Sequence, residues 1–444
     1  MKITDLAQEL QISVSSIKRF ILDFDLDIDE CLTPEFDVKP EFEKFAKENK
    51  EFLSKYENDL DKTKSLDDIA SKIKQPKEKI EEILTREMPQ VFENGMYKSS
   101  VSSFGIDNKL GGNYNFVYDY FGHKTPLEKK DFIGYRDLFF YISEVLEPFI
   151  NKEETKNWGI QKPAGIIMYG PPGSGKIFWA NKISQIIGYE FNEIKKHYLS
   201  STFINGNNVA FNDFLVSMLK KEKVELFLEE FDTVMQVRNA DYSKQEDVTK
   251  EIILHYISKF EQENLLMVGS ANTISEIDEE ILAPGRFDVL IPIFPPNVKE
   301  RTELIRYAMT KRLEKDATLY KILVSNNADH LPFWNVVAEQ MKTFSNTMVI
   351  DFTQSLKKRI RAQYQKERSE NLTISQTLLE AALRDAKTKL TGEYLDQIQQ
   401  FIIDVSLNNY DDFAPRLEAL KVELETYKAK AQPRREIGFN TDDK

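Results

Sequence analysis

Short apolar runs alternate with segments of helical periodicity through the middle of the chain. The runs occupy residues 165–169, 224–228, 265–269 and 289–293, and a further strand is predicted at 190–194. Short buried strands that alternate with helices are typical of a parallel sheet covered on both faces. The pattern therefore predicts an α/β domain with a parallel sheet as its core.

The chain beyond residue 298 has the apolar spacing of helices throughout. Serine and threonine precede apolar runs at 344–347 and 372–377, as expected of helix N-caps. After residue 392 two further amphipathic helices are predicted, on Leu395, Ile398, Phe401 and Ile402 and on Leu417, Leu420, Val422 and Leu424. The polar segment after residue 432 is predicted to be disordered.

The first ninety residues contain an internal repeat without gaps. Residues 3–10, continuing to 17–21, match residues 66–73, continuing to 80–84, at a constant offset. Each copy predicts two short helices joined by a turn, and the second helix opens at Ser13 in one copy and at Pro76 in the other. The first copy resembles the small helical module at the N-terminus of bacterial translation initiation factors.

Two interpretations of these repeats follow from the helix-turn-helix pattern. Such units can contact DNA through their second helix, or they can serve as small helical adaptors for proteins. Acidic residues surround both copies and would repel phosphate: Asp23, Asp25, Asp27, Asp29, Glu30, Asp59, Asp61, Asp67 and Asp68. The charge favours a protein contact or a structural role, with DNA the less favoured partner.

Composition favours a soluble protein of several domains. The 444 residues are 41% hydrophobic and 30% charged, with a formal net charge of -13, which disfavours nucleic-acid binding through bulk charge. No apolar run approaches the roughly 18 residues of a membrane span, and no signal peptide is evident, so we expect a cytoplasmic location. The single cysteine, Cys31, excludes an internal disulfide or a thiolate cluster and is expected to be structural.

A glycine-rich loop follows the first strand of the α/β region and opens a helix. In such a loop, successive backbone N–H groups hold a triphosphate at the helix N-terminus and a lysine reaches the outer phosphates. The last position of the full pattern is a serine or threonine whose hydroxyl ligates Mg²⁺, and Ile177 stands there instead. The residues of the predicted triphosphate-binding loop are Gly170, Pro171, Pro172, Gly173, Ser174, Gly175, Lys176 and Ile177.

A second strand, at 224–228, leads directly into carboxylates. Glu229 and Glu230 follow its last apolar residue, with Asp232 close behind. In a nucleotide-hydrolysing site one such carboxylate holds the metal through water and another polarises the attacking water.

With these motifs in order, residues 131–390 resemble the AAA family of P-loop ATPases. The similar branch contains proteasomal ATPases, membrane-protease unfoldases and segregases. The resemblance implies that Glu230 is the catalytic glutamate, that Glu229 replaces the metal-side aspartate, and that Asn272 senses the γ-phosphate. It also implies an α/β P-loop fold with a helical lid, ATP and Mg²⁺ as cofactors, and a ring oligomer, most simply a homo-hexamer.

The same resemblance assigns three further segments. Ile133 and Gly134 match part of the segment that meets the adenine, where Tyr135 departs from a second glycine. Residues 281–288 match the segment with two arginine fingers, of which Arg286 remains and the other position is Ala283. Phe203 and Ile204 match the pore loop that grips a translocated polypeptide; ordinary packing is the other interpretation of Phe203.

Three departures leave the function open between an enzyme and a binding module, because Ile177, Glu229 and Ala283 all weaken hydrolysis. The favoured function is an ATPase that remodels, unfolds or disassembles a protein substrate, since the residues that act on the transferring phosphoryl group are present: Lys176, Glu230, Asn272 and Arg286. One alternative is a nucleotide-binding scaffold with little or no hydrolysis, and another is a DNA-linked regulator. Direct Mg²⁺ ligation by Glu229 would compensate for Ile177.

The predicted organisation has five parts. An all-α adaptor region with tandem repeats spans 1–90 and is expected to bind an adaptor or target protein, and a linker or irregular extension spans 91–130. The α/β nucleotide-binding domain spans 131–297 and the helical lid 298–392. A helical C-terminal extension follows at 393–444, as part of the lid or as a subunit contact.

Overall fold

The computed structural model describes most of the α/β region, the helices that follow it and the first sixty residues. The described residues are 1–24, 26, 28–33, 36–59, 63–65, 67, 70, 71, 76–78, 80, 92, 93, 96–98, 117, 120, 135–194, 209–235, 244–260, 265–287, 289–311, 313, 314, 316–329, 331–368, 372–408 and 410–431.

A five-stranded parallel sheet forms the centre of the α/β region. Its strands lie in the order β5 (Glu190–Glu193), β6 (Val224–Leu228), β7 (Leu265–Ala271), β4 (Gly165–Tyr169) and β8 (Val289–Pro292). Every residue of β4, β6 and β7 is buried, as expected for central strands covered on both faces. The predicted α/β class with a parallel sheet is confirmed.

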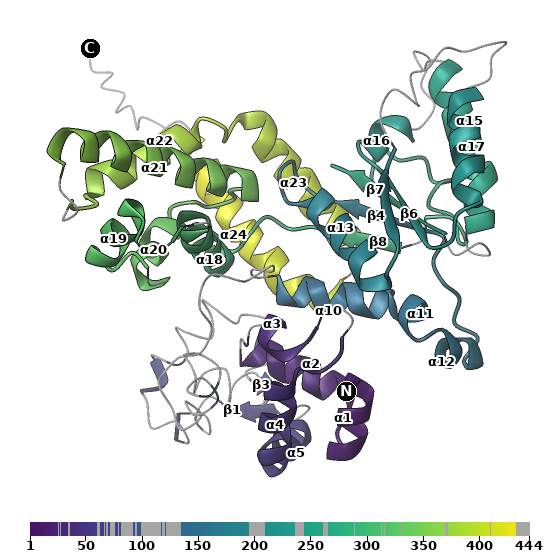
Figure 1. The fold of residues 1–444 in the computed structure, drawn as a ribbon, viewed down its shortest axis with the longest axis horizontal. Helices are drawn as coiled ribbons and strands as arrows, with labels where there is room; N and C mark the ends of the chain where they lie inside the picture. The colour runs from purple at the N-terminus through teal and green to yellow at the C-terminus, as the bar shows by residue number, and fades with distance from the viewer. Residues whose placement is uncertain are drawn as a thin grey trace, which may run out of the picture.

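Helices cover both faces of this sheet. Figure 1 shows α15 (Val209–Leu219) and α17 (Lys244–Phe260) on one side and α13 (Lys176–Ile187) on the other. The short α16 (Phe231–Val234) packs at the end of β7, and α10 (Arg136–Val145) leads through α11 (Glu147–Ile150) and α12 (Lys152–Asn157) towards β4. Helices follow β4, β5 and β6 along the chain, whereas the described residues between β7 and β8 form turns.

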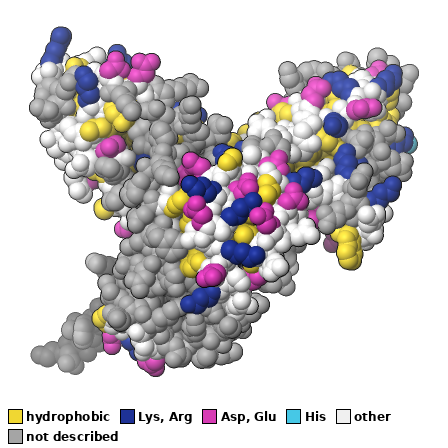
Figure 2. Space-filling model, turned by 60° about the horizontal axis from the view of Figure 1, so that its bottom comes forward, with side chains coloured by type: hydrophobic (Ala, Val, Ile, Leu, Met, Phe, Trp, Pro, Cys, Tyr) yellow, Lys and Arg dark blue, Asp and Glu magenta, His cyan; other side chains and the backbone are white. Residues whose placement is uncertain are grey.

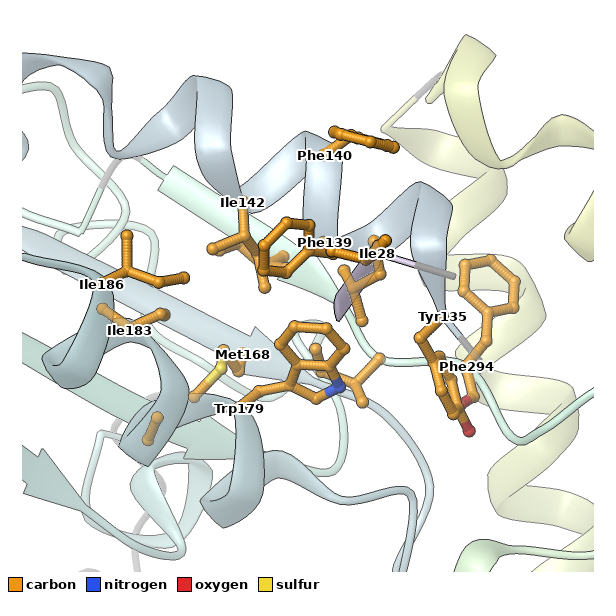
Figure 3. Close-up of a cluster of buried hydrophobic side chains, with 14 of the residues drawn as sticks. Ile28, Tyr135, Phe139, Phe140, Ile142, Met168, Trp179, Ile183, Ile186 and Phe294 are labelled. Carbon is orange, nitrogen blue, oxygen red and sulfur yellow. The ribbon is translucent and has the colours of Figure 1, made fainter. Parts of the chain in front are cut away.

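The helix that follows the glycine-rich loop is fixed by an apolar cluster. Trp179 of α13 is buried against Met168 of β4, and Phe139 and Ile142 of α10 close the cluster from the other side (Figure 3). A close-packed interior of this kind leaves little freedom for movement of α13. The N-terminus of α13 is therefore held firmly at the edge of the sheet.

One buried carboxylate interrupts the apolar sheet. Glu225 of β6 is 0% exposed, and neither of its carboxylate oxygens has a hydrogen-bond partner among the described residues. Burial raises the pKa of Glu225 well above its ordinary value, because the surrounding side chains cannot solvate the charge.

We expect Glu225→Met to raise the free energy of unfolding at neutral pH by about 1–3 kcal/mol, because the desolvation penalty of the acid disappears. At pH values between the pKa of Glu225 in the unfolded chain and its raised pKa in the native state, the native state binds more protons than the unfolded chain. The free energy of unfolding therefore falls as pH rises through this range. Denaturant unfolding at several pH values measures this. A second variant, Glu225→Gln, is neutral at every pH. The difference in unfolding free energy between it and wild type should therefore shrink as pH falls, and a difference that does not change with pH would contradict a raised pKa for Glu225.

In the segment predicted as a lid, the described residues form five helices: α18 (Val298–Thr310), α19 (Thr318–Ser325), α20 (Leu331–Ala338), α21 (Asn346–Glu367) and α22 (Gln376–Lys387). Of the serines and threonines predicted as N-caps, Ser345 caps α21 and Ser375 caps α22. Their hydroxyls accept the backbone N–H groups of Met348 and Leu378. A capping box between Asn297 and Glu300 starts α18.

The two C-terminal helices lie between the lid and the sheet (Figure 1). They are α23 (Gly392–Leu407) and α24 (Ala414–Ala431), joined by a 3₁₀ turn at Asp411–Phe413. Arg416 of α24 forms ion pairs with Asp137 of α10 and Glu300 of α18. Glu423 further along α24 accepts from the Arg301 guanidinium at 3.0 Å. Helix α24 is therefore held to α10 and α18 by ion pairs. The tail from residue 432 lies outside the described residues.

The N-terminal region begins with the predicted pair of helices, α1 (Ile3–Leu10) and α2 (Val14–Asp23), and the Ser13 hydroxyl caps α2 by accepting the Ser16 N–H. Three more helices follow: α3 (Ile28–Cys31), α4 (Pro40–Glu48) and α5 (Lys50–Asp59). Cys31 is fully buried, and this burial raises the pKa of its thiol, in keeping with a structural role. Most of the second repeat lies outside the described residues.

A small antiparallel sheet, which the sequence does not predict, joins β1 (Thr63–Ser65), β3 (Met96–Lys98) and β2 (Phe92–Glu93). Two of its strands fall in the segment interpreted as a linker, where the apolar pattern is too short to show a period.

The N-terminal helices contact the start of α10. The Arg136 side chain donates to the carbonyl of Leu26 at 2.7 Å, and the rings of Phe36 and Phe139 lie 5.0 Å apart.

Within the described part of the chain, no helix combines the length and the apolar content needed to cross a membrane.

Candidate active site

The glycine-rich loop connects β4 to α13 in the geometry of an anion cradle. Gly173 has φ 77° and Gly175 has φ 104°, in the left-handed region that favours glycine. A Cβ on Gly173 would also lie 2.2 Å from the Thr347 hydroxyl oxygen of the lid. Because the loop turns into the N-terminus of α13, unpaired backbone N–H groups of that helix are available to an anion.

Lys176 stands at the first position of α13 and points back over the loop. Its Nζ donates to the carbonyls of Gly170 at 2.7 Å and Pro171 at 3.3 Å, and to Asn272 Oδ1 at 3.1 Å. Burial lowers the pKa of Lys176 to about 8, against the opposing effect of the Asp232 and Glu229 carboxylates. Two residues predicted from separate motifs, Lys176 and Asn272, are thus in direct contact.

The carboxylates predicted after β6 lie at the same edge of the sheet. Glu229 and Glu230 are both exposed, and Glu229 is close enough to influence Lys176. Glu230 has φ 54°, an uncommon conformation for a residue with a side chain, and it stands before the short helix α16. Such conformations are concentrated at functional sites, and this one sets the direction of Glu230 at the strand end.

Asp232 is a site residue to which no sequence motif assigned a role. Its Oδ2 accepts the backbone N–H of Asn272 at 2.6 Å, and its Oδ1 accepts the N–H of Thr233 at 3.1 Å. The only signal in the sequence is its place in the acidic run, directly after the buried Phe231. Asp232 therefore joins the carboxylate segment to Asn272.

Tyr135 connects the loop, the lid and the C-terminal helices. Its hydroxyl donates to the carbonyl of Phe294 at 3.2 Å and accepts from the amide of Asn346 at 3.1 Å. The same amide donates to the carbonyl of Ser174 in the loop at 2.7 Å. In Figure 3 the Tyr135 side chain lies beside Phe294 and near Trp179. The departure from glycine at this position thus has a structural function, although its φ of 51° is unusual for tyrosine.

The remaining predicted residues are not brought to the loop by any described contact. Arg286 donates from Nη1 to the Glu280 carbonyl at 2.7 Å and forms an ion pair with the Glu280 carboxylate at 3.1 Å. Gly134, Phe203 and Ile204 lie outside the described residues.

The carboxylates near the glycine-rich loop fit a metal ion that arrives bound to a nucleotide. Among the described residues, no group of three or more His, Cys, Asp or Glu side chains could hold a metal ion. Ile177 is 46% exposed on the first turn of α13 and offers no ligand. Mg²⁺ commonly keeps several waters and binds through one or two carboxylates plus phosphate oxygens. Glu229 could provide such a carboxylate, and the loop could hold the phosphates.

Comparison with known proteins identifies a domain within the chain. Residues 166–294 match the family described as "ATPase family associated with various cellular activities (AAA)". The chain carries an AAA domain. The match begins in β4 and ends directly after β8, so this AAA domain contains the loop, the carboxylates, Asn272 and Arg286. The resemblance to this group of ATPases is confirmed.

Three curated proteins are similar to part of this chain. An ATP-dependent zinc metalloprotease FtsH 2 of Thermoanaerobacter sp. (strain X514) is 27% identical over 201 residues, 45% of this chain and 39% of that protein. A protein of Bifidobacterium adolescentis described as "AAA ATPase forming ring-shaped complexes" is 25% identical, over 37% of this chain and 35% of that protein. A proteasome-associated ATPase of Gordonia bronchialis is 27% identical, over 47% of this chain and 39% of that protein. The chain thus spans less than two fifths of these relatives.

Proposed function

We propose that this protein is an ATPase that couples ATP hydrolysis to the remodelling, unfolding or disassembly of a protein substrate. The observation that carries the proposal is the 3.1 Å contact between Lys176 and Asn272, beside the carboxylates that end β6. One relative is described as forming ring-shaped complexes and another as proteasome-associated. These descriptions support a ring, most simply a homo-hexamer, acting on polypeptides.

In this proposal each residue acts on one part of the reaction of ATP with water to give ADP and phosphate. The loop N–H groups and Lys176 hold the phosphates, and Glu230 orients the attacking water. Asn272 would contact the terminal phosphate, and Glu229 would hold a Mg²⁺ ion that arrives with ATP and would supply positive charge to the phosphates. Arg286 would leave Glu280 and act on the site of a neighbouring subunit, where it stabilises charge in the transition state.

A nucleotide-binding scaffold is the second candidate, and the exposed Ile177 favours it because the usual metal-binding hydroxyl is missing there. Phosphate release and particle size, measured together in ATP and in ADP, separate the two. The ATPase proposal expects steady release of phosphate and a larger particle in ATP. ATP binding without phosphate release would establish the scaffold instead.

Protonation of Lys176 gives a test of ATP binding that does not depend on turnover. With a pKa near 8 in the free protein, Lys176 loses its charge above that pH, whereas bound phosphates would keep it charged. We expect ATP affinity to fall by up to about tenfold per pH unit above pH 8. Calorimetry in buffers of different ionisation enthalpy should show proton uptake at pH 8. A flat affinity from pH 7 to 9.5 would contradict this role.

For the N-terminal region we propose a protein partner and not DNA. At the start of α2, where a recognition helix would meet DNA, the Glu57 carboxylate accepts from the Ser13 N–H at 2.6 Å and the Ser16 hydroxyl at 2.9 Å. A carboxylate in this position would repel phosphate. The face drawn in Figure 2 also intermixes basic with acidic side chains.

The domain boundaries predicted from the sequence remain part of this proposal, as do a cytoplasmic location and pore contacts through Phe203 and Ile204. The sequence contains no His-Glu-x-x-His motif.

A further inference from the structure

Helix α23 lies across the strand ends that carry the candidate active site. The ring of Phe401 is 5.7 Å from that of Tyr169, the residue before the glycine-rich loop, and 5.0 Å from that of Phe294. The helix belongs to the region after residue 392, which lies outside the segment matched to the AAA family. A part of the chain beyond that match therefore forms one wall behind the site.

A buried carboxylate on this helix binds the turn that follows Asn272. Asp404 is 2% exposed, and its Oδ2 accepts the N–H of Ile274 and the hydroxyl of Thr273, both at 2.9 Å. Its Oδ1 accepts from the Gln400 amide at 3.0 Å. Gln400 also reaches the Ser275 hydroxyl at 3.1 Å. Both oxygens of Asp404 therefore have hydrogen-bond partners. Oδ2 binds the turn directly, and Gln400 links Oδ1 to Ser275 of the turn.

A second buried carboxylate holds the same turn from the other side. Asp232, 7% exposed, accepts the N–H of Asn272 at 2.6 Å. Hydrogen bonds to a carboxylate are shorter and stronger than those between neutral groups, particularly where water is excluded. The backbone from Asn272 to Ile274 is thus fixed between two anionic acceptors that come from α16 and α23.

We propose that Asp404 is a positioning residue that, together with Asp232, fixes the orientation of Asn272 toward the terminal phosphate of ATP. The Asn272 side chain contacts Lys176, so a small rotation of the turn would misplace both groups relative to a phosphate. Interactions in such sites depend on placement to within about 0.5 Å. Helix α23 is then a component of the nucleotide site, and the inference rests on the proposed ATP-binding function.

The test compares the ATP and ADP affinities of the full chain, because only ATP carries the terminal phosphate. We expect Asp404→Ala to lower the ratio of ATP to ADP affinity by about tenfold, and to reduce kcat more than it raises KM. Asp404→Asn retains the shape and one carbonyl acceptor, so its ratio should lie between those of Asp404→Ala and wild type.

Leu424→Ala is the matched control, since Leu424 is buried in α24 and the variant loses packing in the C-terminal region without touching the turn. It should lose stability and keep the wild-type affinity ratio. Equal ratios in wild type and Asp404→Ala would overturn the positioning role even if wild type hydrolyses ATP. A reduced ratio that Asp404→Asn partly restores would support the role even if wild type hydrolyses none.

Discussion

Glu230→Gln is expected to lower ATP turnover by about 10²–10³-fold while ATP binding stays close to that of wild type. The substitution keeps the size of the side chain but removes the carboxylate that would accept a proton from the attacking water. The residue lies at the exposed end of β6, at the edge of the sheet where Lys176 and Asn272 meet. Steady-state phosphate release and equilibrium nucleotide binding measure the two quantities.

Glu222→Gln serves as the control for this substitution, since Glu222 is an exposed carboxylate just before the other end of β6. It changes the net charge by the same amount and should leave turnover unchanged. If Glu230→Gln and wild type release phosphate at the same rate, Glu230 is not the base and the scaffold becomes the better account.

Arg416→Ala is expected to lower the free energy of unfolding by about 3–5 kcal/mol, since it leaves two carboxylates of a buried cluster unpaired. Arg416 lies between Asp137 and Glu300, with its guanidinium carbon 4.9 Å from the centre of the Tyr135 ring. Burial disfavours the charge of Arg416, but the two carboxylates raise its pKa above the ordinary value. Denaturant unfolding monitored by circular dichroism measures the loss.

Lys421→Ala on the same helix is the matched control. Lys421 pairs with Glu418 at 2.7 Å on the surface of α24, where an ion pair contributes only about 0–1 kcal/mol. Arg416→Met, which keeps much of the side-chain length without the charge, should be nearly as unstable as Arg416→Ala. A loss for Arg416→Ala no larger than that for Lys421→Ala would show that the cluster contributes little to stability.

Local patterns of residues were enough to predict the α/β core and the chemical groups of its main loop. The strands β4 and β6 were predicted with their observed bounds, because a buried strand between helices is a local pattern of apolar residues. The loop was recognisable for the same reason: its glycines and Lys176 are neighbours in the chain, and their spacing follows from the backbone turn around a phosphate.

The distant residues that support the site around that loop could be identified only from the folded chain. Asp404 lies 130 residues from Ile274 and Arg416 lies 279 from Asp137, so neither contact leaves a periodic or spaced signal in the sequence. Tyr135 appeared in the sequence only as a departure from glycine, yet the fold places its hydroxyl against the lid. A local pattern specifies strands, caps and loops, whereas contacts between buried polar groups exist only once distant helices have packed.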